Sequence, residues 1–550
     1  MNILRIQTLL LLILCNAGVI AQNLITFQID MHRPMQAHRF DPFAGDSLVL
    51  QGSFNAWKSD GPAFSDNDGD SVFTLAYNFG DRADKKQQYR YVIRRVDGQE
   101  INEQDPDPQN PDHGNRRIIL TGKPYTVPVT AFNLAKRQTD SEFKYSVSAL
   151  REDFLQLRDS IEAIHPALYA FTGRGTFDRL FAARLADLRV PMTGGSFYCL
   201  AAPVVAKIGC GHTGLSMPES WWADQPDRFF PFRLFFADSG VYVTSSSDTV
   251  SAVSPGSEIL AINDRSIREI SDLLYSGISA DAFSKAYKRA VLNHDFPYLY
   301  ALFYGFPETY TVRYRDPATM RIMEYRAKPV SRQKIQKQTQ PQELSFTEYR
   351  DPAAALLRIG TFAYYSPEQE SHFRAFVDST FYDLRENHTD DLILDIRNND
   401  GGNPFCAAYL LAYLTDDPLP YFDRPFGKYR QLAEPIPPAA NNYQGDLFVL
   451  IDGGDFSTTG HLCALLKYHG IGIFVGSETG GTYICNDAEK TIRLKNTGIG
   501  LRIAQGTFAV AVAGMDRRHG IYPDYPVSQR ISDITVGKDT MLEYVLKLIR

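Results

Sequence analysis

The sequence predicts a multidomain protein with an N-terminal β-sandwich, a helical segment, a mixed module and a C-terminal α/β core. At 550 residues the chain is too long for one hydrophobic core. Residues 23–130 contain short alternating segments separated by turn clusters such as SDNDGD, which is typical of a sandwich. From residue 355 onward, short apolar strands alternate with helical patterns, which is typical of a parallel sheet covered by helices.

The composition excludes one class of partner. Hydrophobic residues make up 44% of the chain and charged residues 22%, so ordinary packed cores can form. The net charge is −7, and the basic residues are scattered along the sequence. Because there is no basic excess to neutralise phosphates, we expect no nucleic-acid partner.

The N-terminus has the pattern of a signal peptide covering residues 1–21. Arg5 supplies a positive charge, residues 9–14 are apolar, and a short cleavage-site pattern precedes Gln22. We therefore expect the mature chain to begin near Gln22 and to lie in the periplasm or the extracellular space. The apolar run is too short to span a bilayer, and no later segment is long enough, so no transmembrane segment is expected. Cys15 raises a lipoprotein hypothesis, although a leucine precedes it where a lipobox requires a small residue.

The cysteines do not form a recognisable framework. After cleavage an odd number remains at wide, irregular spacing, which argues against a disulfide scaffold and against a cysteine metal site. These residues are Cys199, Cys210, Cys406, Cys463 and Cys485. Buried free thiols are the expected state, and one bridge between Cys199 and Cys210 stays open. No metal or organic cofactor is expected.

The predicted β-sandwich spans residues 22–130. Its segment GSFNAW, residues 52–57, resembles a strand end in early-Set immunoglobulin-like modules related to glycogen-binding domains. Trp57 is either a platform for a sugar ring or, more commonly for such a residue, a buried tryptophan of the sandwich core. The resemblance thus raises a glycan as a second partner, without establishing it.

Two further parts precede the core. Residues 141–222 should be helical, because apolar residues recur at spacings of three and four; one helix is expected over residues 177–188, ended by Pro191 and the Gly194-Gly195 pair. In residues 229–331, the segment PGSEILAIN resembles the turn and strand of PDZ domains, which bind extended peptides by strand addition. A linker rich in Gln and Lys then leads into the core, residues 343–550.

Four segments of the chain resemble peptidase family S41, which includes the carboxyl-terminal processing proteases and the tricorn core. They occur in the order of the family and read LILDIRNNDGGN, LFVLIDGGDFSTTGHLCALL, VGSETGG and HGIYPDYPV. The resemblance covers most of residues 145–550. It implies a crotonase-like α/β core and a serine peptidase that acts on proteins or peptides.

Ser457 is the candidate nucleophile. The buried strand LFVLID ends in a Gly-Gly-Asp turn, and a helix is predicted to begin at Ser457. Free N–H groups and the helix dipole at such a position favour a developing oxyanion. The competing interpretation is that Ser457 is only an N-cap, which serine commonly is.

The resemblance also implies an oxyanion hole made of backbone amides. It assigns them to the turn at Gly401 and Gly402 and to Thr458, the residue after the nucleophile. Glycines let the backbone approach a substrate carbonyl closely. The alternative, which does not exclude the first, is that this segment is simply a tight turn.

The base that activates Ser457 is expected to be His212. Family members use either a lysine in a loop where this chain has Thr482, or a histidine upstream of the PDZ region. The segment IGCGHTGL carries His212 at that upstream position, with Gly211 where the tricorn protease has a supporting serine. His461 is a rival, because it lies one helical turn after Ser457.

The acid that would orient the histidine has two candidates. The resemblance points to the segment before the closing GIYPD motif, where Asp516 lies near the family position. Glu478, in the SETGG loop, is the other candidate. A buried carboxylate on the histidine Nδ1 would fix the tautomer and stabilise the imidazolium.

The predicted function is an endopeptidase or C-terminal processing peptidase that forms an acyl-enzyme on Ser457 with His212 as base. The alternative is a non-catalytic protein that binds peptides or glycans and retains the fold, because the lysine and the supporting serine are missing. Carbohydrate hydrolysis is disfavoured, since no convincing pair of carboxylates stands in a catalytic context.

Overall fold

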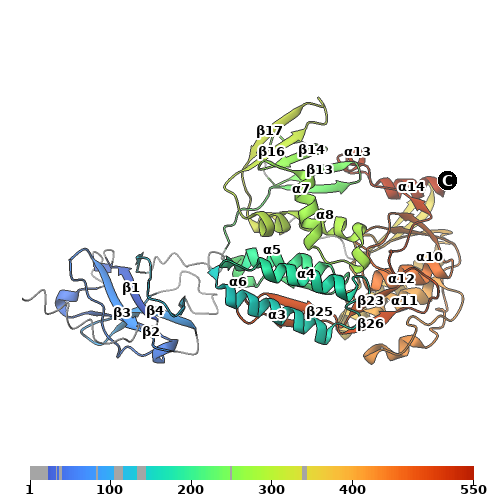
Figure 1. The fold of residues 1–550 in the computed structure, drawn as a ribbon. Coiled ribbons are helices and arrows are strands. Elements are labelled where there is room, and N and C mark those ends of the chain that lie inside the picture. Colours follow the sequence, from blue (N-terminus) through green and yellow to red (C-terminus); the bar gives the residue numbers. More distant parts are fainter. Residues whose placement is uncertain are drawn as a thin grey trace, which may run out of the picture. The chain divides into compact units, whose positions relative to one another are not determined.

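The computed structural model describes residues 23–31, 34–35, 40–81, 85–103, 115–132, 144–223, 225–247, 251–336 and 344–549. The chain divides into two compact units, residues 1–139 and 140–550, which we describe separately (Figure 1). The expected signal peptide, the loop at residues 105–113 and the end of the linker before residue 344 lie outside the described residues.

The first unit contains two sheets around one apolar cluster. Alternate residues of β1 are buried, as the period of two requires. Aromatic rings fill the cluster, and Phe27 and Tyr89 meet edge to face at 4.8 Å. One sheet joins β1 (Leu24–Asp30) to β3 (Val72–Asn78), β7 (Tyr125–Thr126) and β8 (Thr130–Ala131). The other joins β2 (Ser47–Gly52), β4 (Lys86–Arg94), β5 (Glu100–Asn102) and β6 (Arg116–Ile119), and the short helices η1 (Pro42–Ala44) and η2 (Ser53–Asn55) flank β2.

Trp57 does not lie in the core of this unit, so the expectation of a buried sandwich tryptophan is wrong. Phe54 takes the core position, with only 6% of its surface exposed. Residues 56 and 57 then adopt left-handed conformations that turn the chain outward. The Trp57 ring is half-buried, with the Arg90 guanidinium 5.5 Å above it. An arginine already covers that ring, so nothing in this arrangement supports a sugar platform.

The second unit begins with helices. In α3 the residues at spacings of three and four, among them Phe154 and Leu157, are buried in one cluster. Gly194 and Gly195 do not end a helix as expected; they begin α5, because the Thr193 hydroxyl caps it and the Trp221 ring lies against Gly195. The elements are β9 (Lys144–Tyr145), α3 (Val147–Ile164), α4 (Arg174–Asp187), β10 (Met192–Thr193), α5 (Gly194–Ala206), β11 (Gly214–Ser216) and α6 (Glu219–Ala223).

A mixed module follows. Its antiparallel sheet has the order β12-β13-β14-β16-β17, and a second apolar cluster lies between this sheet and two helices. Its elements are β12 (Phe232–Ala237), β13 (Gly240–Ser246), β14 (Glu258–Ile262), β15 (Arg265–Ser266), α7 (Ile267–Gly277), η3 (Asp281–Phe283), α8 (Lys285–Tyr304), β16 (Tyr310–Arg315), β17 (Ile322–Ala327) and α9 (Arg332–Gln336). The turn η3 between the helices reaches toward the active site.

The core is an α/β layer structure. Its sheet has the order β18-β19-β20-β21-β22-β27, parallel except for the β18–β19 pair. One apolar cluster contains residues of α10, α11 and α12, and another contains residues of α14. The elements are β18 (Leu344–Arg350), β19 (Ala353–Ile359), α10 (Pro367–Glu386), β20 (Asp391–Asp395), α11 (Pro404–Leu414), η4 (Gly427–Ala433), β21 (Asp446–Ile451), α12 (Thr458–Tyr468), β22 (Ile473–Gly476), β27 (Tyr525–Pro526), α13 (Ile531–Ile534) and α14 (Thr540–Leu548).

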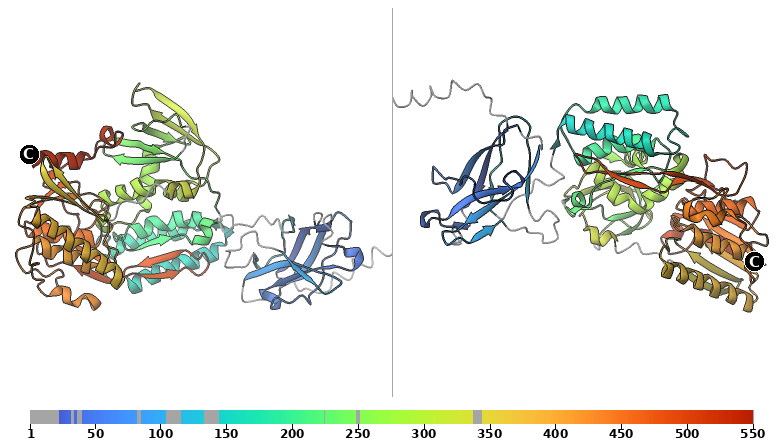
Figure 2. Two further views of the ribbon diagram at one scale, coloured as in Figure 1. Left: turned by 180° about the vertical axis from the view of Figure 1, so that it is seen from behind. Right: turned by 90° about the horizontal axis from the view of Figure 1, so that it is seen from below.

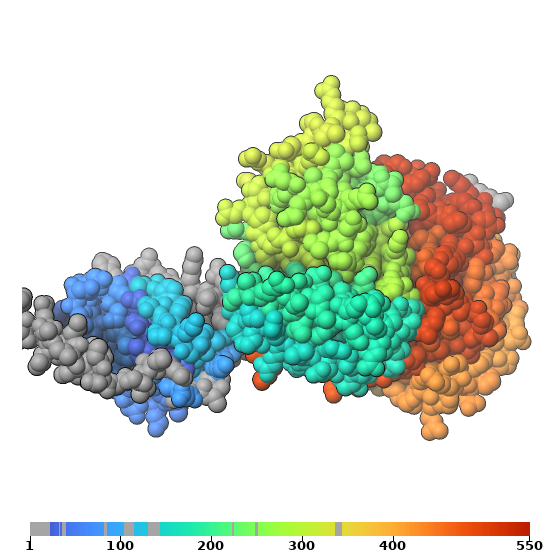
Figure 3. All heavy atoms as spheres, viewed as in Figure 1, coloured from blue at the N-terminus to red at the C-terminus, as the bar shows by residue number. Residues whose placement is uncertain are grey.

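A two-stranded ribbon leaves the core and runs to the N-terminal helices. It consists of β23 (Ile484–Asp487), β24 (Lys490–Arg493), β25 (Gly500–Ile503) and β26 (Gly506–Ala509). β25 pairs antiparallel with β11, and its apolar residues join the cluster of α3 and α5. Figure 1 labels β25 beside α3, and both views of Figure 2 show the ribbon running along the helices. Figure 3 shows the helices at residues 147–206 against both the mixed module and the core.

Two expectations about the whole chain can be compared with the described residues. No helix among them is long and apolar enough to cross a membrane. All five cysteines that remain after residue 22 are free thiols, and four of them are buried. The open question of a Cys199–Cys210 bridge is thereby answered in favour of separate thiols.

Candidate active site

Ser457 lies at the turn between β21 and α12, in a strained conformation. Its φ of 54° and ψ of −123° are unusual for a residue with a side chain. The side chain occupies the N-cap position without making a capping hydrogen bond. Instead, Ser457 Oγ lies 3.1 Å from Nε2 of His212, and both residues are 8% exposed. The geometry therefore differs from that of a simple cap.

Aromatic packing holds the His212 ring beside the serine. The ring of Phe456, the residue before Ser457, stacks on His212 with centroids 4.8 Å apart and planes 26° apart. The Phe456 ring also packs against Tyr287 of α8, with ring centroids 4.4 Å apart. Burial lowers the pKa of His212 to about 4; nearby Asp487 opposes this shift and Arg502 adds to it. A neutral imidazole can accept the proton of a hydroxyl at Nε2.

Because residue 211 is a glycine and has no side chain, the Phe456 ring can pack against its backbone. A Cβ on Gly211 would stand 2.4 Å from the Phe456 ring, closer than real contacts allow. A side chain at this position, such as the supporting serine of the tricorn protease, therefore cannot be accommodated without moving the ring. Here the Phe456 ring, and not a hydroxyl, supports the histidine.

We expect Gly211→Ser to reduce the rate of peptide hydrolysis by about 100-fold, because a misplacement of about 1 Å at a reacting group has this effect. The matched control is Gly214→Ala, whose Cβ would meet only Ser279 Oγ at an ordinary 3.7 Å. Steady-state kinetics of both variants check this expectation. Equal activity of the two variants would show that the Phe456 stack does not position His212.

His461, the rival base, makes no contact with Ser457 Oγ in the structure. It is buried between the edges of Tyr421 and Phe422, and neither ring nitrogen has a hydrogen-bond partner within the described residues. Burial, with a smaller contribution from His212, lowers the pKa of His461 to about 3. Of the two candidate histidines, the structure brings only His212 to the serine.

The candidate oxyanion donors separate into two groups. The N–H of Gly401 donates to Asn399 Oδ1 at 2.9 Å and is already occupied. The N–H groups of Gly402 and Thr458 have no acceptor within the described part of the chain. The Thr458 hydroxyl donates to the Gly402 carbonyl at 2.8 Å, so these two residues are tied together. Two of the three candidate amides thus remain available to a substrate.

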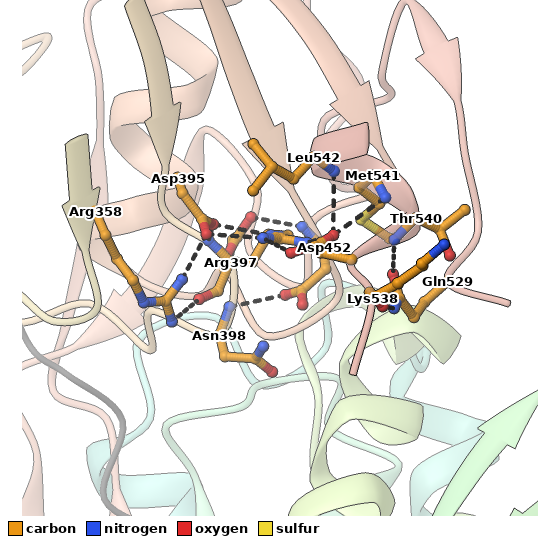
Figure 4. Close-up of polar contacts among 12 residues, drawn as sticks. Arg358, Asp395, Arg397, Asn398, Asp452, Gln529, Lys538, Thr540, Met541 and Leu542 are labelled. Atoms are coloured by element: carbon orange, nitrogen blue, oxygen red, sulfur yellow. Dashed lines mark hydrogen bonds and ion pairs between the residues drawn. The ribbon is translucent and has the colours of Figure 1, made fainter. Parts of the chain in front are cut away.

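A buried ion-pair network lies at the end of β20, just before the turn at residues 399–402 (Figure 4). Arg397, near the end of β20, donates to Asp395 at 2.7 Å and to Asp539, the N-cap of α14, at 2.6 Å. Arg358 adds a 2.8 Å bond to Asp395. Burial alone would raise the pKa of Asp395, but the arginines hold it below its usual value. The network fixes the chain just before the turn at residues 399–402.

The two predicted acids do not lie against His212 in any contact of the described residues. Asp516 is exposed and binds Arg518 at 3.0 Å. Glu478 accepts from the N–H of Gly520 at 3.0 Å and faces His519 at 3.7 Å. Asp516 is thus held within its own loop, and Glu478 is held by the segment at residues 519–520.

Two carboxylates that the sequence did not suggest lie closer to the histidine. Asp487 Oδ2, on the ribbon, is 3.9 Å from Nε2, the nitrogen that faces the serine. Asp281, in η3, is 5% exposed and accepts the N–H of Gly211 at 2.8 Å. Neither residue belongs to a motif, because each reaches the site through a turn or ribbon from a distant part of the chain.

Two groups of side chains place potential metal-binding atoms within 4.8 Å of one another. One is His212 with Asp487 and Glu489, and the other is Asp66 with Asp68 and Asp70. In the first, Glu489 pairs with Arg502 at 3.3 Å. In the second, Asp66 accepts backbone N–H groups of its own turn. Because neighbouring protein groups engage these carboxylates, we assign a metal to neither.

A cavity of about 310 Å³ opens beside the serine. Ser457, Gly402 and Thr458 lie in its wall, so the hydroxyl and the two unoccupied amides face one space. Four of the ten other lining residues are Phe or Tyr, and charged groups are also present. The other lining residues are Tyr365, Pro404, Phe422, Lys428, Tyr429, His461, Cys485, Asp487, Ala488 and Phe508.

Comparison with known proteins identifies the core. Residues 353–527 match Peptidase family S41, whereas no curated protein matches the sequence. The crystal structure of mature CPAF is similar over 73% of this chain and 97% of that chain, with a TM-score of 0.54 and 16% identity. Mature CPAF complexed with lactacystin gives a TM-score of 0.53 at 16% identity, covering 73% and 98% of the two chains. At these identities the likeness shows a shared fold.

The match to the family includes the strand that ends before the Gly401-Gly402 turn, the turn itself and the segment around Ser457. By this match, residues 353–527 form a core of the kind found in peptidase family S41, that of a serine-type peptidase.

Proposed function

We propose that the protein is an endopeptidase or C-terminal processing peptidase that hydrolyses proteins or peptides outside the cytoplasm, with Ser457 as nucleophile and His212 as general base. The contact that carries this proposal is the 3.1 Å approach of Ser457 Oγ to His212 Nε2. Two buried polar side chains from distant parts of the chain meet there in the arrangement that activates a serine. Export rests on the signal-peptide pattern of residues 1–21, and sequencing the secreted chain from Gln22 would test it.

The reaction proceeds in two halves. Ser457 Oγ attacks the carbonyl carbon of the scissile peptide while its proton passes to His212 Nε2. The resulting tetrahedral oxyanion collapses, the C–N bond breaks, and the leaving amine takes the proton from Nε2. Water then repeats the sequence on the acyl-enzyme, losing a proton to Nε2 and releasing the carboxylic acid and the free serine.

The N–H groups of Gly402 and Thr458 are our proposed oxyanion donors. Both are free of protein acceptors and border the cavity at the serine. Donors of this kind are effective because they are fixed before the reaction and need no reorganisation. Gly402 requires glycine, since its φ is 137° and a Cβ would stand 2.2 Å from the carbonyl carbon of Phe362.

The aromatic cavity suits the side chain on the acyl side of the scissile bond. Phe422, Tyr429 and Phe508 offer apolar surface next to the nucleophile, which favours a large apolar side chain. Lys428 is exposed, so its charge stays in contact with solvent. We therefore propose cleavage after large apolar residues.

One experiment tests the nucleophile and the preference together. The purified chain and Ser457→Ala are each incubated with a denatured protein, and the cleavage sites are mapped by mass spectrometry. We expect the unsubstituted chain to cleave at least about tenfold more often after large apolar residues than after glycine or charged residues. We expect no cleavage by Ser457→Ala.

A fluorophosphonate probe provides a second readout, because it labels an activated serine without regard to the peptide sequence. Labelling of the unsubstituted chain and not of Ser457→Ala supports the proposed mechanism. If the unsubstituted chain is neither labelled nor active on any denatured protein, the peptidase mechanism is wrong and a peptide-binding protein with this fold takes its place.

A further inference from the structure

Two buried atoms beside the catalytic pair lack hydrogen-bond partners. His212 Nδ1 is one, and Oδ2 of Asp281 is the other, when the whole described part of the chain is considered. One is a ring nitrogen that can donate, and the other is a carboxylate oxygen that can accept. An unsatisfied buried polar atom costs about 1–3 kcal/mol, so two complementary ones in one place require an explanation.

No hydrogen bond or ion pair joins these two atoms among the described residues, but the backbone at Gly211 links the residues that carry them. Oδ1 of Asp281 accepts the N–H of Gly211 at 2.8 Å, and Gly211 immediately precedes His212. Because Nε2 faces Ser457, the ring presents its other nitrogen on the side nearer its own backbone. The Asp281 carboxylate is bonded to the backbone one residue before this ring.

The backbone around Asp281 is fixed to the histidine segment. The N–H of Ala282 donates to the carbonyl of Gly209 at 3.1 Å, which makes a second tie between the two segments. Ala282 and Phe283 then adopt left-handed conformations, with φ of 48° and 67°. Two such residues in succession are strained, and strain of this kind persists where the surroundings demand one geometry. The turn η3 thus delivers the carboxylate at a conformational cost.

We propose that Asp281 is the positioning residue of a Ser457–His212–Asp281 triad, its carboxylate accepting the His212 Nδ1–H. This inference rests on the proposed function. The bond would hold the proton on Nδ1, keep Nε2 free to accept from Ser457, and stabilise the imidazolium that forms during attack. Asp281 gives up no proton and takes none, so the steps described above stay balanced.

Asp487 is the competing carboxylate, and its position distinguishes it. Its Oδ2 is 3.9 Å from Nε2, which is the nitrogen already engaged by Ser457. A carboxylate there can attract the imidazolium through charge but cannot set the tautomer that catalysis requires. The Asp487 side chain is also 40% exposed, so water weakens its effect.

Asp281→Asn tests the proposal with little change in shape, because the amide oxygen of asparagine can still accept the Gly211 N–H. Its NH₂ group would face Nδ1 and favour the tautomer with the proton on Nε2. We expect kcat/KM to fall by on the order of 10²–10⁴-fold with KM little changed. Asp272→Asn is the matched control: this carboxylate of α7 is exposed and lies outside the site, so kcat/KM should stay that of the unsubstituted chain.

The pH dependence separates positioning from a structural role. Burial raises the pKa of Asp281 to about 7, so the His212–Asp281 pair should hold a proton up to about that pH. Without the carboxylate the histidine titrates alone, so half-maximal kcat/KM should move to lower pH in Asp281→Asn. A purely structural role would lower the plateau without moving this midpoint. The other titratable or charged groups that act on His212 or Asp281 are Asp487, Arg502, His461, Tyr287, Cys210 and Cys485. They are unchanged in the variant.

A second variant and a double variant complete the test. If the asparagine variant fails to fold, Asp281→Ser replaces it in the test. Its hydroxyl can still accept the Gly211 N–H, and we expect its kcat/KM to fall by about 100-fold. In a His212→Ala background, Asp281→Asn should cause no further loss, because it acts through the histidine. Full activity of both Asp281 variants, an unmoved midpoint or an additive loss would each overturn the assignment. Failure of the proposed function itself would look different, since the unsubstituted chain would then not react with fluorophosphonate.

Discussion

Replacing Ser457 or His212 by alanine is expected to lower kcat/KM by on the order of 10⁴–10⁶-fold, and replacing both should lower it no further. The two side chains form one hydrogen-bonded unit at 3.1 Å, so removing either one disables the other. The residual rate would come from substrate binding and from the amides of Gly402 and Thr458. Steady-state kinetics of the two single variants and the double variant provide the measurement.

His461→Leu is the control for this prediction. The His461 side chain is buried among apolar rings and makes no hydrogen bond within the described residues, so a leucine of similar size should fit. We expect its activity to stay within about tenfold of the unsubstituted chain, since it forms part of the cavity wall. A loss as large as that of His212→Ala would make His461 the base and contradict the assignment.

Arg397→Met should destabilise the core by about 3 kcal/mol. The substitution leaves Asp395, whose side chain is 5% exposed, with Arg358 as its one remaining arginine. It also takes the arginine from Asp539 at the start of α14, which then keeps only its capping bonds from the N–H groups of Met541 and Leu542. The urea midpoint followed by circular dichroism measures the effect, because the described tryptophans lie outside the core.

The matched control for Arg397 is an ion pair that faces solvent. Arg385 contacts Glu386 at 3.3 Å, and both side chains are more than half exposed. Arg385→Met should change the stability by less than about 0.5 kcal/mol. If both substitutions have the same small effect, the buried network does not hold β20 and α14 together.

The sequence alone predicted the core elements closely, because their signals are local. The strand before the nucleophile spans Asp446–Ile451, and the predicted helix from Ser457 begins at Thr458. Helix α11 (Pro404–Leu414) is one of the helical segments expected to alternate with strands after residue 355. An apolar strand, a glycine turn and a capping position depend on neighbouring residues and so can be read from a short segment.

The rest of the site could not be predicted, because it depends on contacts between distant segments. Asp281 lies in a three-residue turn, and no motif surrounds it. The ribbon of β23 to β26 was missed, since its strands are short and pair outside the main sheet. A tryptophan in such a module is more commonly buried in the core than free to bind a sugar, but left-handed conformations at residues 56 and 57 carry Trp57 outward. The roles assigned to individual site residues stay predictions until the variants are measured.

The ribbon sets the order in which a functioning enzyme can arise during synthesis. His212 immediately precedes a segment that the ribbon secures, since the N–H of Ala504 donates to the Thr213 hydroxyl at 3.1 Å and β25 pairs with β11. Ribosomes make this part of the chain almost last, well after the segment with Ser457. A nascent or truncated chain that ends before residue 500 therefore carries a serine but no anchored base. Such a chain would be unable to digest itself or its neighbours before its own folding was complete.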